Sequence, residues 1–229
     1  MKLKSTLALL TCSVLSMNAH ADTVLGLYLG VQGWQVDSKG SYQLLSSDAY
    51  QVDGDNTRSS FYAALEHPIP LLPNIKVRQN NLTADTELSA TEVNFDHRDY
   101  SLYYEIFDND IIAIDVGING KTFDGRAVDI AGNQVSGFSE TIPTAYLATR
   151  VGLPFTHWAV TGEAKALTID DSSLTDVQAA LEYRIIDNLA VDVSISAGYR
   201  SLRVDLDDVD GLFSDIDFNG PFLSVDVHF

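Results

Sequence analysis

The sequence predicts an all-β protein, a transmembrane antiparallel up-and-down β-barrel of about ten strands. The first observation is that apolar and polar residues alternate with period 2 in segments of about ten residues. The second is an export-type apolar segment at the start of the chain, and the third is an alternating last segment that ends in Phe229. After the first segment, no stretch reaches the roughly 18 continuous apolar residues of a membrane-spanning helix, so a membrane location requires a barrel.

The N-terminal segment has the composition of a secretory signal. Lys2 and Lys4 precede an apolar run, and the small residues Ala19 and Ala21 occupy the positions that a signal peptidase reads. We expect residues 1–21 to be a signal peptide. Its removal would take away Cys12, the one cysteine, so thiol chemistry, disulfides and cysteine-ligated zinc are not expected in the exported protein.

The charge of the chain excludes one class of partner. The formal net charge is −18, and loss of Lys2 and Lys4 would make the mature chain more negative still. Such a chain repels phosphate backbones, so we expect no nucleic-acid partner. Hydrophobic residues nevertheless make up 45% of the chain, which is enough apolar surface for a folded domain.

Alternation sets the expected strands, and its clearest case is the segment 189–200. There Val193, Ile195 and Tyr199 fall on one face, while Asp192 and Arg200 fall on the other. We expect strands at 23–36, 57–67, 75–86, 94–107, 111–123, 142–153, 158–168, 174–186, 189–205 and 218–229. An even strand number returns both ends of the sheet to one side, as in bacterial outer-membrane barrels.

The connections between these strands form two classes. Mostly short turns would face the periplasm, and the segments 37–56, 87–93, 124–141, 169–173 and 206–217 would form outer loops. Aromatic residues near the expected strand ends would form girdles at the two membrane interfaces. These residues are Trp34, Phe107, Phe155, Trp158 and Tyr183.

The last strand places Leu223, Val225, Val227 and Phe229 on one face, which resembles the signal that the outer-membrane assembly machinery reads. Further matches are Gly26 to Trp34, the stretch 64–76 with Pro68, Pro70 and Pro73, Leu102 to Ile106, Asp115 to Gly117 and Phe123 to Gly125. On these residues the mature chain, 22–229, resembles a family of small proteobacterial outer-membrane β-barrel proteins. The resemblance implies an outer-membrane barrel and supplies no catalytic or binding residues. Ten strands follow from the spacing, and eight, as in barrels of the OmpA and OmpW types, stay open.

The polar faces of the strands predict a charged interior. The expected lumen residues are Glu66, Glu105, Asp115, Lys121, Arg150, Glu163, Lys165, Glu182, Arg184, Asp192 and Arg200. With Asp226, Lys76 and Arg78 on the same faces, seven acids meet seven bases in an interior only slightly wider than side chains can fill. We favour a plug of ion pairs over a narrow polar conduit, because opposite charges at close quarters pair across the gap.

Two further groups of residues have side chains suited to chemistry. His97 and Asp99 share a face near the expected outer rim, where a barrel hydrolase would place its site. Asp205, Asp207, Asp208 and Asp210 are weak candidates for divalent cations, because carboxylates at close spacing are what Ca²⁺ takes. A solvated acidic loop is the favoured interpretation, so no metal or cofactor is expected.

These observations lead to a non-enzymatic, monomeric outer-membrane barrel with a structural or surface-interaction role. Its expected partners are membrane lipid, lipopolysaccharide and the assembly machinery. The first alternative is a porin-like narrow channel for ions or small solutes, and the second is an outer-membrane hydrolase at the extracellular rim.

Overall fold

The computed structural model describes residues 25–44, 50–85, 92–109, 111–128, 135–169, 172–188, 190–209 and 212–229, so the expected signal peptide lies outside the described residues. The strands are β1 (Gly26–Leu44), β2 (Tyr50–Glu66), β3 (Asn74–Asn80), β4 (Thr83–Asp85), β5 (Glu92–Asn94), β6 (His97–Asp108), β7 (Ile112–Val128), β8 (Val135–Gly152), β9 (Trp158–Ile169), β10 (Ser172–Asp187), β11 (Asp192–Val209) and β12 (Leu212–His228). No helix among the described residues has the length and hydropathy to span a membrane.

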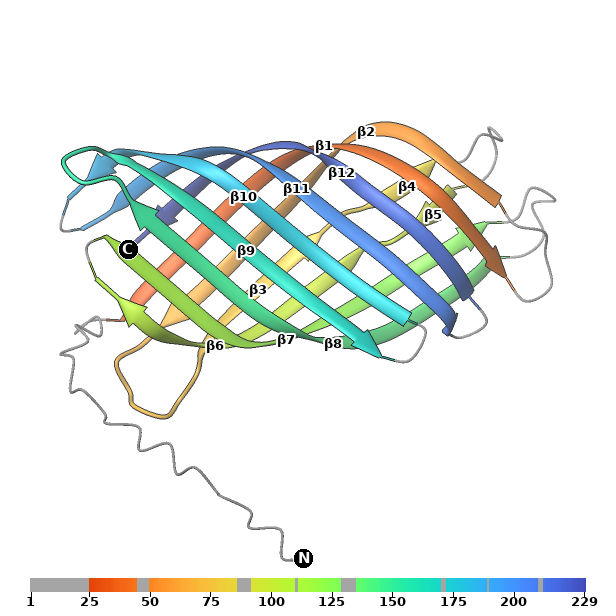
Figure 1. The fold of residues 1–229 in the computed structure, drawn as a ribbon, viewed down its shortest axis with the longest axis horizontal. Helices are drawn as coiled ribbons and strands as arrows, with labels where there is room; N and C mark the ends of the chain where they lie inside the picture. Colours follow the sequence, from red (N-terminus) through yellow and green to blue (C-terminus); the bar gives the residue numbers. More distant parts are fainter. Residues whose placement is uncertain are drawn as a thin grey trace, which may run out of the picture.

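The sheet closes into an antiparallel barrel (Figure 1). Its twelve labelled strands make ten strands of the barrel, because two of the ten are interrupted. β3 with β4 forms the third strand of the barrel and β5 with β6 the fourth. β7 pairs with its sequence neighbour β8, and pairing of β12 with β1 closes the barrel. The prediction of a ten-stranded antiparallel barrel is therefore confirmed, and the eight-stranded alternative is wrong. Gly26 at the start of β1 and His228 at the end of β12 lie at one end of the barrel, which we call the terminal end, and the opposite end is the distal end.

Several strands extend further toward the distal end than the ranges expected from the sequence. β1 and β2 pair without interruption from Gly26 opposite Glu66 to Tyr42 opposite Tyr50. β11 and β12 likewise pair up to Val209 opposite Leu212. Most of the segments 37–56, 124–141 and 206–217 are therefore strand, and their interpretation as long loops is wrong.

The proline-rich segment between β2 and β3 is a turn at the terminal end, as expected. Proline has no N–H to give to a sheet, and three prolines here keep the chain out of the ladder. The Asn74 side chain accepts a hydrogen bond from the His67 N–H at 3.0 Å, and the Tyr104 hydroxyl donates one to the Leu71 carbonyl at 3.0 Å. These bonds fix the turn to the ends of β2, β3 and β6.

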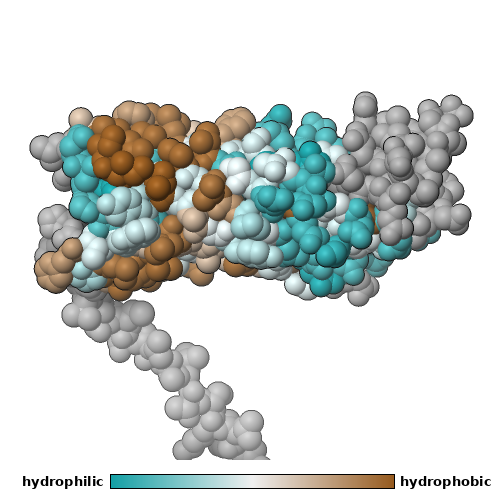
Figure 2. Space-filling model, turned by 90° about the horizontal axis from the view of Figure 1, so that it is seen from above, coloured by the Kyte–Doolittle hydropathy of each residue, from teal (hydrophilic) through white to brown (hydrophobic). Residues whose placement is uncertain are grey.

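The outer surface of the barrel is apolar around its terminal half and polar around its distal half. Figure 2 shows the apolar surface gathered toward one end, and the outward residues Phe61, Ile118 and Leu223 are each more than half exposed. We call this ring of outward side chains the apolar belt. Its members include Leu29, Val31, Phe61, Val77, Leu102, Ile106, Val116, Ile118, Leu147, Val160, Leu181, Ile195, Leu223 and Val225.

Inside the barrel the polarity is the reverse of that on the outer surface: the interior is polar in the terminal half and apolar in the distal half. Along β11 the outward residues change from Ile195 to Arg203 without any change of parity, while the inward residues change from Ser196 to Leu202 and Val204. Buried apolar side chains then fill the distal half, as in a water-soluble barrel. This distal core comprises Trp34, Val36, Tyr42, Val52, Leu82, Phe95, Phe123, Leu174, Leu202, Val204, Leu206, Ile216 and Phe218, and Ala180 and Phe222 extend the same buried cluster to the wall of the terminal half.

The expectation of a polar interior along the whole barrel is therefore wrong for the distal half. Trp34 is a second correction, because it lies inside the barrel and not in an interfacial girdle. Its indole N–H donates to the Gly220 carbonyl at 3.1 Å, and its ring lies 4.7 Å from the Arg200 guanidinium. A side chain at position 220 would collide with the Gln35 carbonyl, so glycine permits this close approach of β12 to β1.

Candidate functional site

A continuous layer of buried charges crosses the barrel between the distal core and the terminal half. We call it the charged layer. It comprises Lys76, Arg78, Asp99, Lys121, Glu163, Lys165, Asp176 and Arg200, from β3, β6, β7, β9, β10 and β11. Lys121 is fully buried, and Lys165 and Arg200 are nearly so.

The ion pairs of the charged layer form a chain from one wall to the other. Glu163 bonds Lys76 at 2.6 Å and Lys165 at 3.0 Å, and Lys165 bonds Asp99 at 3.1 Å. From Asp99 the chain continues through Lys121, at 2.9 Å, to Asp176, at 3.0 Å.

Arg200 of β11 links Asp176 back to β3, the strand of Lys76 at which the chain of ion pairs begins. Its guanidinium donates to both carboxylate oxygens of Asp176, at 2.9 and 2.8 Å, and to the Asn80 amide oxygen at 2.9 Å. Asn80 in turn donates to Asp99 at 3.1 Å. Each buried charge therefore has at least one partner of opposite charge, which is the condition for a buried charge to be tolerated.

The charged layer holds five cations and three anions. Three of the cations also lie over aromatic rings, which partly compensates the excess positive charge. Lys76 lies 4.5 Å and Arg78 5.4 Å from the centre of the Tyr62 ring, and Arg200 lies over Trp34. A cation over an aromatic face is attracted by the ring quadrupole. Among the described residues, the charged layer and the distal core occupy the interior above the terminal half.

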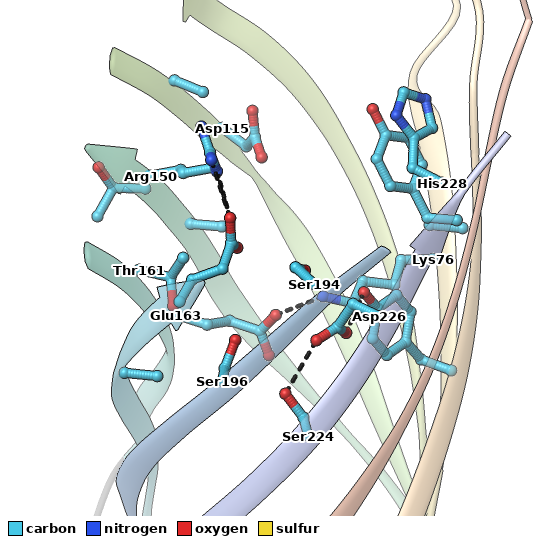
Figure 3. Close-up of a pocket in the computed structure, with 18 of the residues that line it drawn as sticks. Lys76, Asp115, Arg150, Thr161, Glu163, Ser194, Ser196, Ser224, Asp226 and His228 are labelled. Carbon is cyan, nitrogen blue, oxygen red and sulfur yellow. Dashed lines mark hydrogen bonds and ion pairs between the residues drawn. The ribbon is translucent and has the colours of Figure 1, made fainter. Parts of the chain in front are cut away.

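Below the charged layer, the terminal half encloses a cavity of about 680 Å³ (Figure 3). Residues near the turns and strand ends line it, among them Asn109, Arg184, Asp192 and His228, so the cavity opens at the terminal end. Glu163 and Lys76 of the charged layer line its opposite, closed end. The volume is within the range of small-molecule sites.

The cavity wall is predominantly acidic. Eight carboxylate residues line it against four lysines and arginines. Arg150 donates twice to Glu182, at 3.0 and 2.8 Å, and Asp226 accepts from the Tyr62 hydroxyl at 2.8 Å and from Ser224 at 2.9 Å. Figure 3 shows the Ser224 bond to Asp226 and the Lys76 bond to Glu163 on adjoining parts of the wall.

The structure places the expected lumen residues in two groups, all on inner faces of the barrel. Those that line the cavity are Glu66, Glu105, Asp115, Arg150, Glu163, Glu182, Arg184 and Asp192. Lys121, Lys165 and Arg200 lie in the charged layer. Asp99 and Asp176 were missing from the expected lumen, although they have the parity of Glu105 and Glu182 and continuing the alternation would have found them.

His97 and Asp99 do not form a site at an extracellular rim. Both are buried inside the barrel, and Asp99 is held by two lysines. His97 lies on the distal side of the charged layer, where its Nδ1 is 2.9 Å from the Phe95 carbonyl and its ring packs against Phe123. Burial and the nearby Lys121 lower the pKa of His97 to about 3, so the ring is neutral at physiological pH.

The close group of possible metal ligands in the structure is not the group of aspartates at 205–210 that the sequence suggested. Among the described residues, the group whose ligand atoms lie close enough for a metal is His97, Asp99 and Asp176. Lys121 bonds both carboxylates of this group, so a cation already occupies the position between them. Asp205 and Asp207 lie on β11 and point away from the distal core, whereas the Asp208 side chain and Asp210 lie outside the described residues.

The predicted assembly-signal residues lie on the outer face of the barrel at its closing strand. Leu223, Val225 and Phe229 are exposed, and Phe229 exchanges backbone hydrogen bonds with Leu27 of β1 at 2.9 and 3.2 Å. The last residues thus close the sheet against its first strand. Recognition by the assembly machinery stays a prediction.

No family model and no curated protein matches the chain. Several solved outer-membrane structures are similar to it at low identity. The outer membrane protease OmpT from Escherichia coli has a TM-score of 0.49 and 9% identity, over 92% of this chain and 97% of that one. Outer membrane protein AlkL has a TM-score of 0.40 and 14% identity over 89% of each chain. Neisserial surface protein A has a TM-score of 0.38 and 10% identity, over 88% of this chain and 95% of that one. The chain itself is a closed β-barrel whose terminal half has an apolar outer belt and a polar interior, as outer-membrane barrel proteins have.

Proposed function

We propose that the protein is a monomeric outer-membrane barrel that is closed to solute flow and that has a structural or surface-interaction role in the envelope. The charged layer carries this proposal. An open channel needs a continuous polar path, whereas here paired, buried charges cross the barrel and an apolar core lies above them. Ion pairs in such an interior resist separation because the desolvation cost of each freed charge is several kcal/mol.

The apolar belt supports the membrane location. Every backbone group of a closed barrel can be paired within the sheet, which is what hydrocarbon requires. Trp158 and Tyr183 lie together at the terminal end, with ring centres 4.7 Å apart, in a position suited to a membrane interface. With the terminal end in the periplasm, the polar distal half would stand in water outside the cell.

The outer face of the distal half supports the surface role. Its exposed charges include the pairs Arg203 with Asp215, at 2.9 Å, and Lys39 with Asp37, at 3.1 Å. Lipopolysaccharide is the partner we propose for this surface, with divalent ions bridging its phosphates to outward carboxylates. Loss of lipopolysaccharide binding on chelation with EDTA would support this, and binding unchanged by EDTA would contradict it.

Conductance in a planar bilayer tests the closed barrel directly. Purified protein, with its barrel verified by heat-shifted gel mobility, should produce no discrete current steps, while a general porin in the same bilayer should conduct. Reproducible steps from the folded protein would overturn the proposal. Loss of those steps on Lys165→Ala would then support the channel alternative through the predicted lumen residues.

A further inference from the structure

Beyond the closed-barrel role, we propose that the terminal cavity binds a small organic ammonium ion between Glu66, Glu105 and Asp115. The three carboxyl groups come from β2, β6 and β7 and lie on one side of the cavity wall. Two tyrosines, Tyr103 and Tyr146, line the same part of the wall.

The pairing of the strands brings like charges together here. Glu105 and Asp115 are direct cross-strand partners and both line the cavity. Like charges directly opposite one another in a sheet are destabilising. Glu66 lines the same cavity, and the hydrogen bond from Tyr103 ties its carboxylate to β6, the strand of Glu105. Such a cluster needs a cation or a shared proton to be stable.

The cations of the cavity are engaged elsewhere. Lys76 bonds Glu163 at 2.6 Å, and Arg150 gives two hydrogen bonds to Glu182. Asp115 has no hydrogen bond or ion pair with any residue that the structure describes. The dashed line from Arg150 in Figure 3 is its bond to Glu182, and no dashed line reaches Asp115.

Tyr146 is an independent sign of a missing partner. Its side chain lines the cavity, it is 3% exposed, and its ring centre lies 5.5 Å from that of Tyr103. The Tyr103 hydroxyl donates to Glu66 at 2.7 Å, whereas the Tyr146 hydroxyl has no hydrogen-bond partner among the described residues. This hydroxyl is the polar end of an otherwise buried side chain at the cavity wall, so a bound ligand could form a hydrogen bond with it.

The geometry favours an ammonium over a metal ion. The three carboxyl groups do not form one of the close ligand groups found among the described residues, which consist of His97, Asp99 and Asp176 alone. An ammonium has N–H donors that can spread over several carboxylates and a hydroxyl. The tyrosine rings offer faces for its alkyl part and its charge, and the cavity has room for several carbon atoms.

Calorimetric titration of the folded protein in detergent at pH 8 tests the proposal. The probes are butylamine, 1,4-diaminobutane, the neutral 1-butanol, and calcium chloride. We expect at least one amine to bind at one per barrel, with no heat from 1-butanol and no displacement by calcium. Asp115→Asn should weaken amine binding about tenfold or more, because a charged hydrogen bond is lost.

Matched variants separate the site from the general negative field of the cavity. Asp226→Asn removes the same charge from the same cavity, but its carboxylate already has two donors, so binding should fall by less than about threefold. Tyr146→Phe should weaken binding without changing the charge.

Each remaining outcome would overturn the proposal. Absence of amine binding would show that a shared proton stabilises the cluster. Equal losses in Asp115→Asn and Asp226→Asn would show a non-specific field, and tighter binding of calcium than of either amine would show a metal site. Heat-shifted mobility of each variant confirms that the barrel has formed.

Discussion

Asp176→Asn should destabilise the folded barrel strongly, because Asp176 is the anion that anchors the charged layer at β10. Its carboxylate accepts from Arg200 at 2.9 and 2.8 Å and from Lys121 at 3.0 Å. Replacing it with an amide raises the excess of buried cations and leaves one oxygen as acceptor. Lys121 keeps Asp99 and Arg200 keeps Asn80, so both cations retain a partner.

Breaking a buried ion pair by removing one partner costs about 3–5 kcal/mol, and the retained partners place this variant near the lower value, about 3 kcal/mol. The free energy of unfolding in urea, followed by heat-shifted gel mobility, measures the loss. Asp215→Asn is the matched control, because Asp215 bonds Arg203 at 2.9 Å on the exposed outer face, where a pair contributes about 1 kcal/mol or less. Equal losses in the two variants would refute the argument that burial of the charged layer matters.

Two further predictions concern the distal core and the apolar belt. The pKa of His97 is about 3 in the folded protein and 6.5 in the unfolded chain, so the unfolded chain takes up a proton first as the pH falls. The free energy of unfolding is therefore highest above pH 6.5 and should be lower by about 2 kcal/mol at pH 5. Unfolding of His97→Gln should therefore depend less on pH between 7 and 5 than that of the wild type, and parallel curves would contradict the neutral buried ring. Ile195→Arg should cost about 2–4 kcal/mol if the apolar belt lies in hydrocarbon, whereas Arg203→Ala on the same outer face of β11 should cost little. Equal unfolding free energies for these two variants in lipid vesicles would place Ile195 outside the hydrocarbon.

The order of the strands and the inner face of the charged residues could be predicted from the sequence, whereas the inward position of Trp34 was not predicted. Alternation is a local property of the pleated strand, so Glu182 and Arg184 could be assigned to the interior without any knowledge of their neighbours. The proline-rich turn followed from the missing N–H groups of Pro68, Pro70 and Pro73. These features require only residues close in sequence.

The extent of the strands was harder to predict, although a signal was present. In β11 and β12, Val204 and Leu206 alternate with aspartates, as do Ile216 and Phe218. The many aspartates suggested a loop, because an interior of constant polarity was assumed. The pattern in fact continues with its polarity reversed, as expected where a barrel leaves hydrocarbon and enters water.

The alternation of residues along the chain is enough to predict a closed antiparallel barrel with charged residues on its inner face. Which of those charges meet depends on how distant strands are brought together in the folded barrel. Lys76 and Glu163 are 87 positions apart, yet they bond at 2.6 Å, while Asp115 lies in the same cavity without a hydrogen bond or ion pair among the described residues. Such contacts depend on the number of strands, their stagger and the closure of β12 on β1, and these are set by the whole sheet and not by any one strand.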